Sequence, residues 1–287
     1  METFEIEATD GARLSAYRWD AEGPLKGMVQ IAHGAAEHLK RYDRLARALR
    51  GAGYGVIAAD HRGHGVNAGV HGLGNFGPRG FSGVVEDMAA VSAAAKARHP
   101  GAPLVLLGHS LGSFAAQAYL LDHAGNLSGL VLSGTAALDA LLASRDPTGG
   151  LKSFNAAFEP ARTDFDWLSR DAAEVDAYIA DPLCGFDIGS DSMASVAVTA
   201  GGASADSRLA NAAAKNLPIL IISGEVDPVV GPGQAFARTL ADRYAGAGLT
   251  QLEHKIYPGG RHEMFNETNR AEVTADLIAW LDAKVVG

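Results

Sequence analysis

The chain has 287 residues, of which 47% are hydrophobic and 20% charged, so it can bury a sizeable core and is not an intrinsically disordered protein. Its 24 basic and 33 acidic residues give a formal net charge of −9, which argues against electrostatic binding of nucleic acid or an anionic membrane. The single cysteine, Cys184, excludes an intrachain disulfide. The first ten residues lack the basic and apolar regions of a signal peptide, and no segment is long enough to span a membrane, so we expect a soluble, cytoplasmic protein.

In chain order, the first predicted element is an antiparallel hairpin over residues 4–19, where apolar and polar side chains alternate around Asp10-Gly11. Short apolar runs follow, of the kind typical of parallel strands covered on both faces. They lie at 28–32, 56–59, 104–107, 130–132 and 219–222, with a last strand over 250–257. Helical periodicity at 42–49, 84–95 and 273–281 separates some of these strands, so the pattern predicts an α/β fold with a mostly parallel sheet.

This alternation stops between about 135 and 212. The stretch shows no strong strand, only short helical pieces at 136–143 and 172–180, and it is rich in aromatic residues. It is too long for a single crossover connection. We therefore predict a helical cap (lid) inserted at 135–212 over the carboxyl edge of the sheet, with residues 1–134 and 213–287 forming the core.

The sequence Gly108-His109-Ser110-Leu111-Gly112 lies between a predicted strand and a predicted helix. In that context Gly-x-Ser-x-Gly indicates a nucleophile elbow, a tight turn that exposes the serine hydroxyl in a cleft. Glycines are needed at both ends because side chains there would collide with the neighbouring strand and helix. A simple glycine-rich turn is the alternative, and the strand before and helix after make it the weaker one.

A serine hydroxyl needs a general base, and after such an elbow the acid and the histidine follow in that order. Asp227 and His262 each follow a predicted strand, at the edge where open α/β sheets gather their sites. Glu225 is a second candidate acid, and we favour Asp227 because it precedes a proline in the loop. His254 falls within the last predicted strand, so His262 is the better candidate base.

Two backbone N–H groups should stabilise the oxyanion of a tetrahedral intermediate. The residue after the nucleophile, Leu111, supplies one, and Ala35, in the loop after strand 28–32, is the candidate for the other. His33 in the same loop is interpreted as a hydrogen-bonded structural histidine.

His61 and His64 have the spacing of metal ligands, but no acidic or cysteine partner completes a recognised site. We therefore predict no metal and no cofactor. For Cys184 two interpretations stay open, a residue that lines the cap and a small buried hydrophobic side chain.

Taken together, these residues resemble the α/β-hydrolase superfamily, and within it the monoacylglycerol lipase and lysophospholipase-like branch of the serine aminopeptidase S33 type. The resemblance spans nearly the whole chain and is weak in the cap. It implies an eight-stranded α/β-hydrolase fold, a triad of Ser110, Asp227 and His262, and oxyanion donors at Ala35 and Leu111. Four blocks carry it: residues 33–38 with Arg41-Tyr42, then 60–65, 108–112 and 260–263.

The resemblance further implies a carboxylic ester hydrolase that acts through an acyl-enzyme on a small-molecule substrate such as a monoacylglycerol, a lysophospholipid or another small ester. Amide, peptide or thioester hydrolysis and acyl transfer stay open, because they use the same fold and triad. An inactive hydrolase-fold binding protein is disfavoured because all three triad residues are present. In this family the cap shapes the acyl pocket and some members touch lipid surfaces through it, so transient lipid contact is a further expectation. The candidate cap contacts to substrate, with core packing as the alternative role, are Phe154, Phe158, Trp167 and Tyr178.

Overall fold

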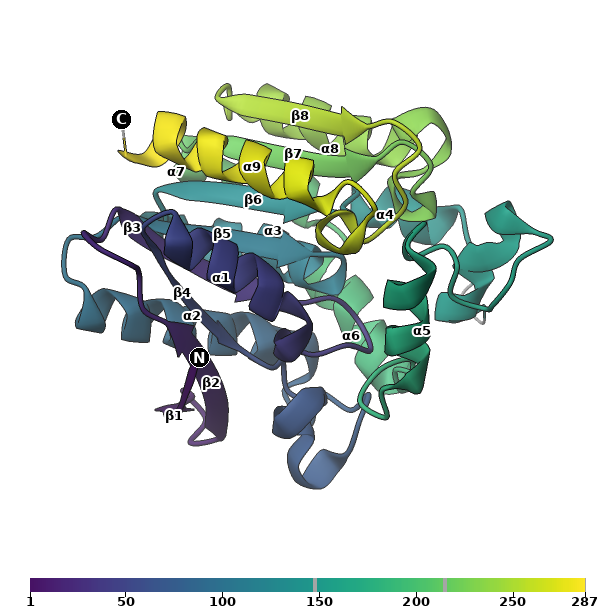
Figure 1. Ribbon diagram of the computed structural model, residues 1–287, viewed down its shortest axis with the longest axis horizontal. Helices are drawn as coiled ribbons and strands as arrows, with labels where there is room; N and C mark the ends of the chain where they lie inside the picture. The colour runs from purple at the N-terminus through teal and green to yellow at the C-terminus, as the bar shows by residue number, and fades with distance from the viewer. Residues whose placement is uncertain (147–148, 214–215, 287) are drawn as a thin grey trace.

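The computed structural model of the protein describes residues 1–146, 149–213 and 216–286. Within these residues an eight-stranded sheet forms the centre, in the order β1-β2-β4-β3-β5-β6-β7-β8 (Figure 1). The strands are β1 (Glu2–Glu7), β2 (Arg13–Trp19), β3 (Gly27–Ala32), β4 (Tyr54–Ala59), β5 (Leu104–His109), β6 (Gly129–Ser133), β7 (Ile219–Gly224) and β8 (Leu252–Tyr257). Strands β1 and β2 form an antiparallel edge hairpin, β2 pairs antiparallel with β4, and the other pairs are parallel. The predicted α/β sheet and edge hairpin are thus confirmed.

The inner parallel strands are apolar because helices cover both of their faces. Every residue of β3, β4, β5, β6 and β7 is buried, whereas the edge strand β8 is largely exposed. That difference explains why β8 contains charged side chains such as Glu253 and Lys255, whereas the inner strands are continuous apolar runs.

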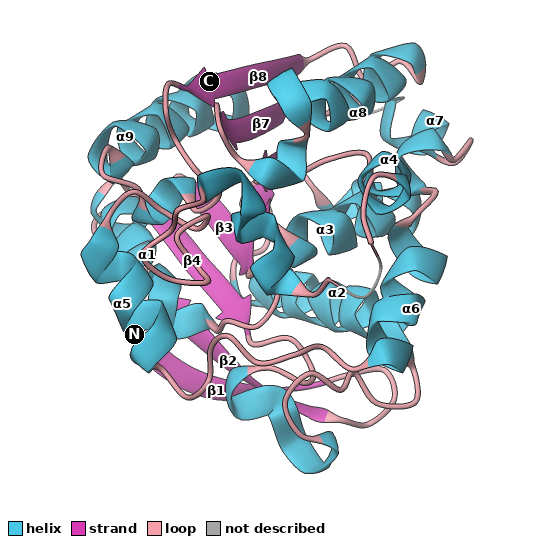
Figure 2. Ribbon diagram, turned by 90° about the vertical axis from the view of Figure 1, so that its right-hand side faces the viewer, coloured by secondary structure: helices cyan, strands magenta, loops and turns pink. Residues whose placement is uncertain are grey.

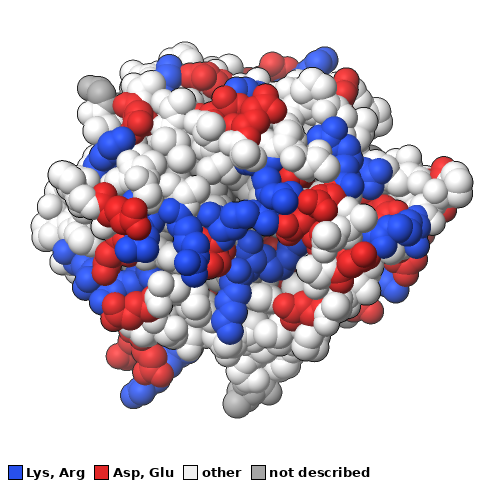
Figure 3. Space-filling view, in the orientation of Figure 1, with Lys and Arg blue, Asp and Glu red and all other residues white. Residues whose placement is uncertain are grey.

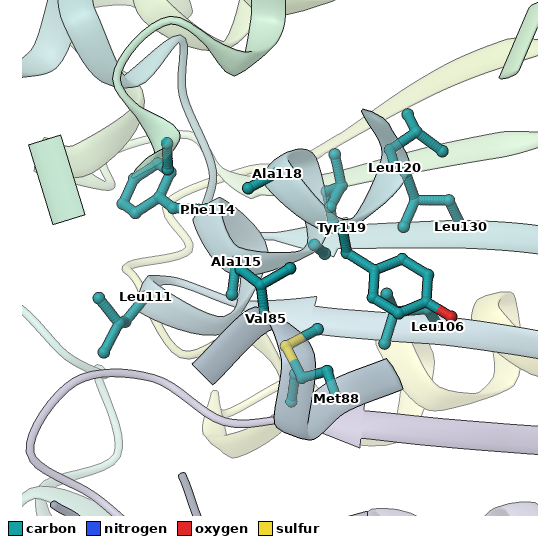
Figure 4. Close-up of a cluster of buried hydrophobic side chains, with 14 of the residues drawn as sticks. Val85, Met88, Leu106, Leu111, Phe114, Ala115, Ala118, Tyr119, Leu120 and Leu130 are labelled. Carbon is teal, nitrogen blue, oxygen red and sulfur yellow. The ribbon is translucent and has the colours of Figure 1, made fainter. Parts of the chain in front are cut away.

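Helices α1 (Asp43–Gly51) and α9 (Arg270–Leu281) cover one face of the sheet, and α2 (Gly80–Arg98), α3 (Leu111–His123) and α8 (Ala235–Gly246) cover the other (Figure 2). Each face has its own apolar cluster. Figure 4 shows part of the larger one, where Val85 and Met88 of α2 lie near Leu106 of β5 and Tyr119 of α3. This packing holds the amino end of α3, and with it Ser110, against the sheet.

The stretch predicted as a cap contains helices and, among its described residues, no strand. Its elements are α4 (Leu138–Ala143), the 3₁₀ segment η4 (Leu151–Phe158), α5 (Ala172–Ala180), α6 (Ser190–Ala200), the 3₁₀ segment Ala203–Ala205 and α7 (Leu209–Ala213). Helices α4 and α5 stand beyond the carboxyl ends of the strands, to the right in Figure 1, whereas α6 packs against α2 and α3. The limits of a separate cap remain a prediction.

Short helical segments complete the loops. They are the 3₁₀ turns Leu39–Tyr42, Gly65–His71, Ala124–Asn126, Pro228–Val230, Pro232–Gln234 and Met264–Asn266 and the π-helical end Asp282–Val286. Gly51 ends α1, and Gly53, with φ of 92°, turns the chain into β4. The glycine-rich run at 51–55 is therefore a helix end and turn, as the sequence indicates by placing it before a strand.

On the face seen in Figure 1, Lys and Arg gather over α1 beside Asp and Glu (Figure 3). Arg44 and Arg47 of α1 pair with Glu174 and Asp43, so carboxylates neutralise much of this basic stripe. In the part of the chain that the structure describes, no helix combines the length and apolar character needed to cross a membrane. The cytoplasmic location stays a prediction from the sequence.

Candidate active site

Ser110 occupies the sharp turn between β5 and α3. Its backbone, with φ of 50° and ψ of −118°, lies in a region that residues with a side chain rarely adopt, so the surrounding packing must hold it there. A Cβ atom at Gly108 would collide with the backbone of Gly112, and one at Gly112 would collide with the carbonyl oxygen of Ala32. The predicted glycines are therefore needed for close approach of helix and strand.

Asp227 and His262 meet beyond the carboxyl ends of β7 and β8. The Oδ2 atom of Asp227 lies 2.9 Å from Nδ1 of His262, and each residue is only 2% exposed. The other carboxylate oxygen accepts a hydrogen bond from the N–H of Val229 at 2.9 Å, which fixes the carboxylate. Because Nδ1 donates to the carboxylate, Nε2 is left as the basic nitrogen of the ring.

Ser110 and His262 line one cleft, with a volume of about 20 Å³, which is room for about one water molecule. Within the described residues the two side chains make no direct hydrogen bond, a contact that in such sites often tightens only when substrate binds. Their neighbours in the cleft wall are Gly34, Ala35, Glu37, His109, Leu151, Trp167, Leu168, Tyr178 and Glu263.

In the loop after β3, the backbone N–H groups on either side of Ala35 are bonded. The N–H of Gly34 donates to Glu37 at 2.6 Å, and that of Ala36 donates to Nε2 of His64 at 3.1 Å. Between them, the N–H of Ala35 has no acceptor among the described residues, and the same holds for the N–H of Leu111 at the start of α3. The structure therefore leaves unbonded the two donors that the sequence singles out, Ala35 in this loop and Leu111 at the start of α3.

The competing candidates lie elsewhere. The carboxylate of Glu225 accepts the N–H of Gly259 at 2.8 Å, and His254, in β8, shares a 2.9 Å hydrogen bond with Ser223. His33 uses both ring nitrogens on the backbone, at Gly34 O and at the N–H of His61, and is thus the structural histidine that the sequence predicts.

A buried charge cluster links the oxyanion loop to the histidine loop. The guanidinium of Arg41 contacts Glu37 at 2.5 Å and Glu263 at 2.6 and 2.7 Å. Burial opposes ionisation of Glu37, but Arg41 together with the hydroxyl of Tyr42 and the N–H of Gly34 keeps its pKa below the usual value. Since Glu37 bonds to Gly34 and Glu263 follows His262, one guanidinium ties both halves of the site together.

Four buried histidines surround the site as neutral rings. Burial lowers the pKa of His64 to about 3 and, with the neighbouring His262, that of His109 to about 4. Burial also holds the pKa values of His33 and His61 well below the usual range. These rings therefore serve as hydrogen-bonding and packing groups near neutral pH.

The four cap candidates divide into two pairs. Trp167 and Tyr178 line the cleft. Phe154 instead packs against the indole of Trp167, with ring centroids 4.7 Å apart, and Phe158 lies beneath the guanidinium of Arg261. Phe154 and Phe158 are thus packing residues in this structure.

Sequence reasoning missed four features of the cleft wall. Leu151 and Leu168 line it but show no distinctive sequence signal. Gly134, with φ of 58°, leaves room for the catalytic-site ring, since a Cβ there would lie 2.7 Å from Cε1 of His262. Glu263 could have been found, because it lies within the fourth family block.

One group of metal-ligating side chains exists away from the cleft. Among the residues that the structure describes, His38, Asp181 and Cys184 bring one ligand atom each within 4.8 Å of one another. His38 already hydrogen-bonds to Asp181 at 2.8 Å, and burial raises the pKa of the Cys184 thiol, which disfavours the thiolate that a metal needs. His64 bonds to the backbone of Ala36, so it acts in bracing the loop.

The strand order, the elbow after β5 and the buried acid–histidine pair define an α/β-hydrolase. The family model described as serine aminopeptidase, S33, matches residues 23–269, and the chain belongs to this family. It is 34% identical over 282 residues to a monoacylglycerol lipase of Mycolicibacterium smegmatis, which covers 94% of this chain and 93% of the relative. It is 28% identical to the monoglyceride lipase of Mus musculus, over 96% of this chain and 89% of that protein.

A solved structure agrees with this assignment. The thermostable carboxyl esterase from Bacillus coagulans, in complex with glycerol, superposes with a TM-score of 0.85 and 26% identity over 99% of both chains. The resemblance stated from the sequence is thereby confirmed at the level of family and fold.

Proposed function

We propose that this carboxylic ester hydrolase cleaves monoacylglycerols and related small esters through an acyl-enzyme formed on Ser110. The observation that carries the proposal is the convergence of Ser110 and an Asp227-bound His262 on one cleft, beside the unbonded N–H of Ala35. These groups come from loops far apart in the sequence, and a purely structural role would not require them to meet.

In acylation, Nε2 of His262 takes the proton from the Ser110 hydroxyl as its oxygen attacks the ester carbonyl carbon. Asp227 keeps the ring in the required tautomer and stabilises the imidazolium. The N–H groups of Ala35 and Leu111 receive the oxyanion, and the alcohol leaves with the proton from the imidazolium. Water then attacks the acyl-enzyme with His262 again as the base, which releases the acid and restores Ser110.

The residues that line the cleft suit a substrate with one polar and one apolar part. Leu151, Leu168 and Trp167 offer apolar surface, whereas Tyr178 and Glu263 are polar. The relatives named above include monoacylglycerol lipases, whose named substrate has such a division. Since the enclosed volume holds about one water molecule, entry of an ester requires cap side chains such as Leu151 to move outward.

Contact of the cap with a lipid surface belongs to the same proposal. Ile179 of α5 and Met193 and Val198 of α6 are exposed, Val198 by 86%. These are the side chains through which we propose that the stretch contacts lipid. Co-sedimentation with phosphatidylcholine vesicles should fall in a Met193→Asp, Val198→Asp variant, and unchanged binding would contradict the lipid contact.

An activity panel tests the proposed reaction. We expect monoacylglycerols to be cleaved with a higher kcat/KM than lysophospholipids, aryl acetates or aminoacyl p-nitroanilides. A fluorophosphonate should label Ser110. Preferred cleavage of the anilides would instead favour the amide and peptide alternative, and failure of labelling would contradict the serine mechanism.

A further inference from the structure

Two aromatic rings contact the imidazole of His262. The centroid of His109 lies 4.6 Å from the imidazole centroid, and that of the Trp167 indole lies 4.7 Å away with an interplanar angle of 35°. His109 comes from the nucleophile elbow, whereas Trp167 belongs to the stretch predicted as a cap. Trp167 is only 3% exposed, so its contact with the imidazole is shielded from water.

The backbone around Trp167 is bound to the histidine loop. The N–H of His262 donates to the carbonyl of Trp167 at 3.3 Å, and the N–H of Glu263 donates to the carbonyl of Leu168 at 2.8 Å. Next to them, the fully buried carboxylate of Glu267 accepts from the backbone N–H and Nε of Arg170 at 3.0 and 2.9 Å. The indole is therefore held at a fixed place beside the imidazole.

A third ring packs against the indole. Phe154 packs on Trp167 with ring centroids 4.7 Å apart, and the guanidinium of Arg145 lies over the Phe154 ring. Phe154 thus contacts the indole, while within the described residues no ring contact joins it to the imidazole. This arrangement supplies a matched control, because Phe154 supports the same packing one ring further out.

Apart from Asp227, the groups around the imidazole are either neutral or already paired with another charge. Asp227 is the one carboxylate bonded directly to the ring among the described residues. Glu37 and Glu263 share the guanidinium of Arg41, and burial with the neighbouring imidazole lowers the pKa of His109 to about 4, so that ring is neutral. From the cap stretch, burial raises the pKa of Tyr178, which is therefore also uncharged.

Resting on the proposed function, we propose that Trp167 is a positioning residue for His262: its indole fixes the imidazole and its electron-rich face stabilises the imidazolium that forms during acyl transfer. Attraction between a cation and an aromatic face is strongest for tryptophan and grows when water is excluded, as it is here. The cap stretch then contributes to the chemistry of the site through a ring that acts on the base, in addition to shaping the space for substrate.

The test compares Trp167→Leu, Trp167→Phe and Phe154→Leu with the wild-type enzyme. In Trp167→Leu we expect kcat to fall about ten-fold, on esters of short and long acyl chains alike. The acidic limb of the kcat/KM profile, which reports the base in the free enzyme, should move to lower pH by about 0.5–1 unit. Trp167→Phe keeps an aromatic face and should recover most of both effects, and Phe154→Leu should leave the limb in place.

An acidic limb that stays in place or moves to higher pH in Trp167→Leu would overturn the inference, because water entering in place of the indole would favour the imidazolium. A loss that depends on acyl length would also overturn it and make Trp167 a substrate contact. Thermal unfolding separates misfolding from these outcomes, and Trp167→Phe keeps the test valid if the leucine variant is unstable. A wild-type enzyme without ester turnover would instead contradict the proposed function itself.

Discussion

The carboxyl edge of the sheet and the stretch of residues 135–212 that covers it are built on different principles. At the sheet edge, polar side chains are buried and bonded, as in the Asp227–His262 pair and the Glu37–Arg41–Glu263 cluster. The covering stretch has short helices and exposed apolar side chains such as Val198. In the proposed function, the core holds the reaction geometry and the covering stretch controls access.

Two segments of the covering stretch are hydrogen-bonded directly to loops of the core. The carbonyls of Trp167 and Leu168 accept N–H groups of the histidine loop. On the other side, the hydroxyl of Tyr178 and the N–H of Gly185 both donate to the carbonyl of Ala36 at 2.9 Å. The covering stretch thus supports both the loop after β3 and the loop that carries His262. Variants in each region then measure how much that region contributes to turnover and to stability.

The largest expected effect belongs to the core. Ser110→Ala should lower turnover of an ester by roughly a million-fold, because no other hydroxyl in the elbow can replace the nucleophile. Steady-state hydrolysis of a p-nitrophenyl ester measures it, with Ser82→Ala on the exposed surface of α2 as the control. If Ser110→Ala retained most of the activity, the placement of the chemistry in the core would be wrong.

The acid gives the next effect. Asp227→Asn should lower kcat by about ten thousand-fold, because the imidazole loses its orienting carboxylate while the hydroxyl and base remain. The matched control is Glu225→Gln, whose carboxylate binds the N–H of Gly259 and not the imidazole. Greater damage from Glu225→Gln would move the role of the acid to that residue.

A third test compares a buried charge of the core with an exposed one of the covering stretch. Arg41→Met should lower the free energy of unfolding by about 3–5 kcal/mol, because it leaves two buried carboxylates without their counter-ion. Arg162→Ala, which removes an exposed pair with Asp176, should leave the midpoint of urea unfolding unchanged. Similar losses in the two variants would contradict the contrast drawn between the regions.

The smallest effect per residue is a pH dependence of stability. In the folded state burial lowers the pKa values of the four neutral histidines, whereas unfolded histidine takes up a proton near its ordinary pKa of 6.5. The stability from this source is complete above pH 6.5 and falls as the pH drops below it. At pH 5 the loss is about 2 kcal/mol for each of His64 and His109, whose pKa values lie at about 3 and about 4. Thermal unfolding from pH 7.5 to 5 measures the loss, which should persist in His71→Gln, where the histidine removed is exposed.

A midpoint that did not fall toward pH 5 would mean that these four rings are already protonated, or solvated, in the folded protein. Buried Asp60 and Asp87 act in the opposite sense, because burial raises their pKa values and the folded state then takes up their protons before the unfolded state does. The change in midpoint toward pH 5 therefore measures the histidines less this opposing contribution.

The sequence predicted the sheet well because inner parallel strands are read directly from continuous apolar runs between turns. It also placed Ser110, Asp227 and His262 at strand ends, since the positions follow from the order of elements. It did not predict η4 or α6, whose alanine, glycine and serine content gives weak helical periodicity. Their position depends on packing against neighbours such as α2.

The long-range contacts of the site could not be predicted from local sequence. Arg41 and Glu263 are separated by more than two hundred positions, and only the fold shows that they form an ion pair. For Trp167 the sequence left substrate contact and core packing open, and its packing on His262 depends on the path of an irregular stretch. Gly134 is required only because an imidazole from a distant loop occupies the space beside it.

The cation shared by Glu37 and Glu263 has a consequence for how the enzyme responds to acidity. Its two carboxylate partners raise the pKa of Arg41 further above an already high value, so the guanidinium keeps its proton throughout the range in which the protein is folded. The positive half of this ion cluster therefore never titrates in the folded protein. The two loops stay joined through the guanidinium wherever its carboxylate partners are ionised.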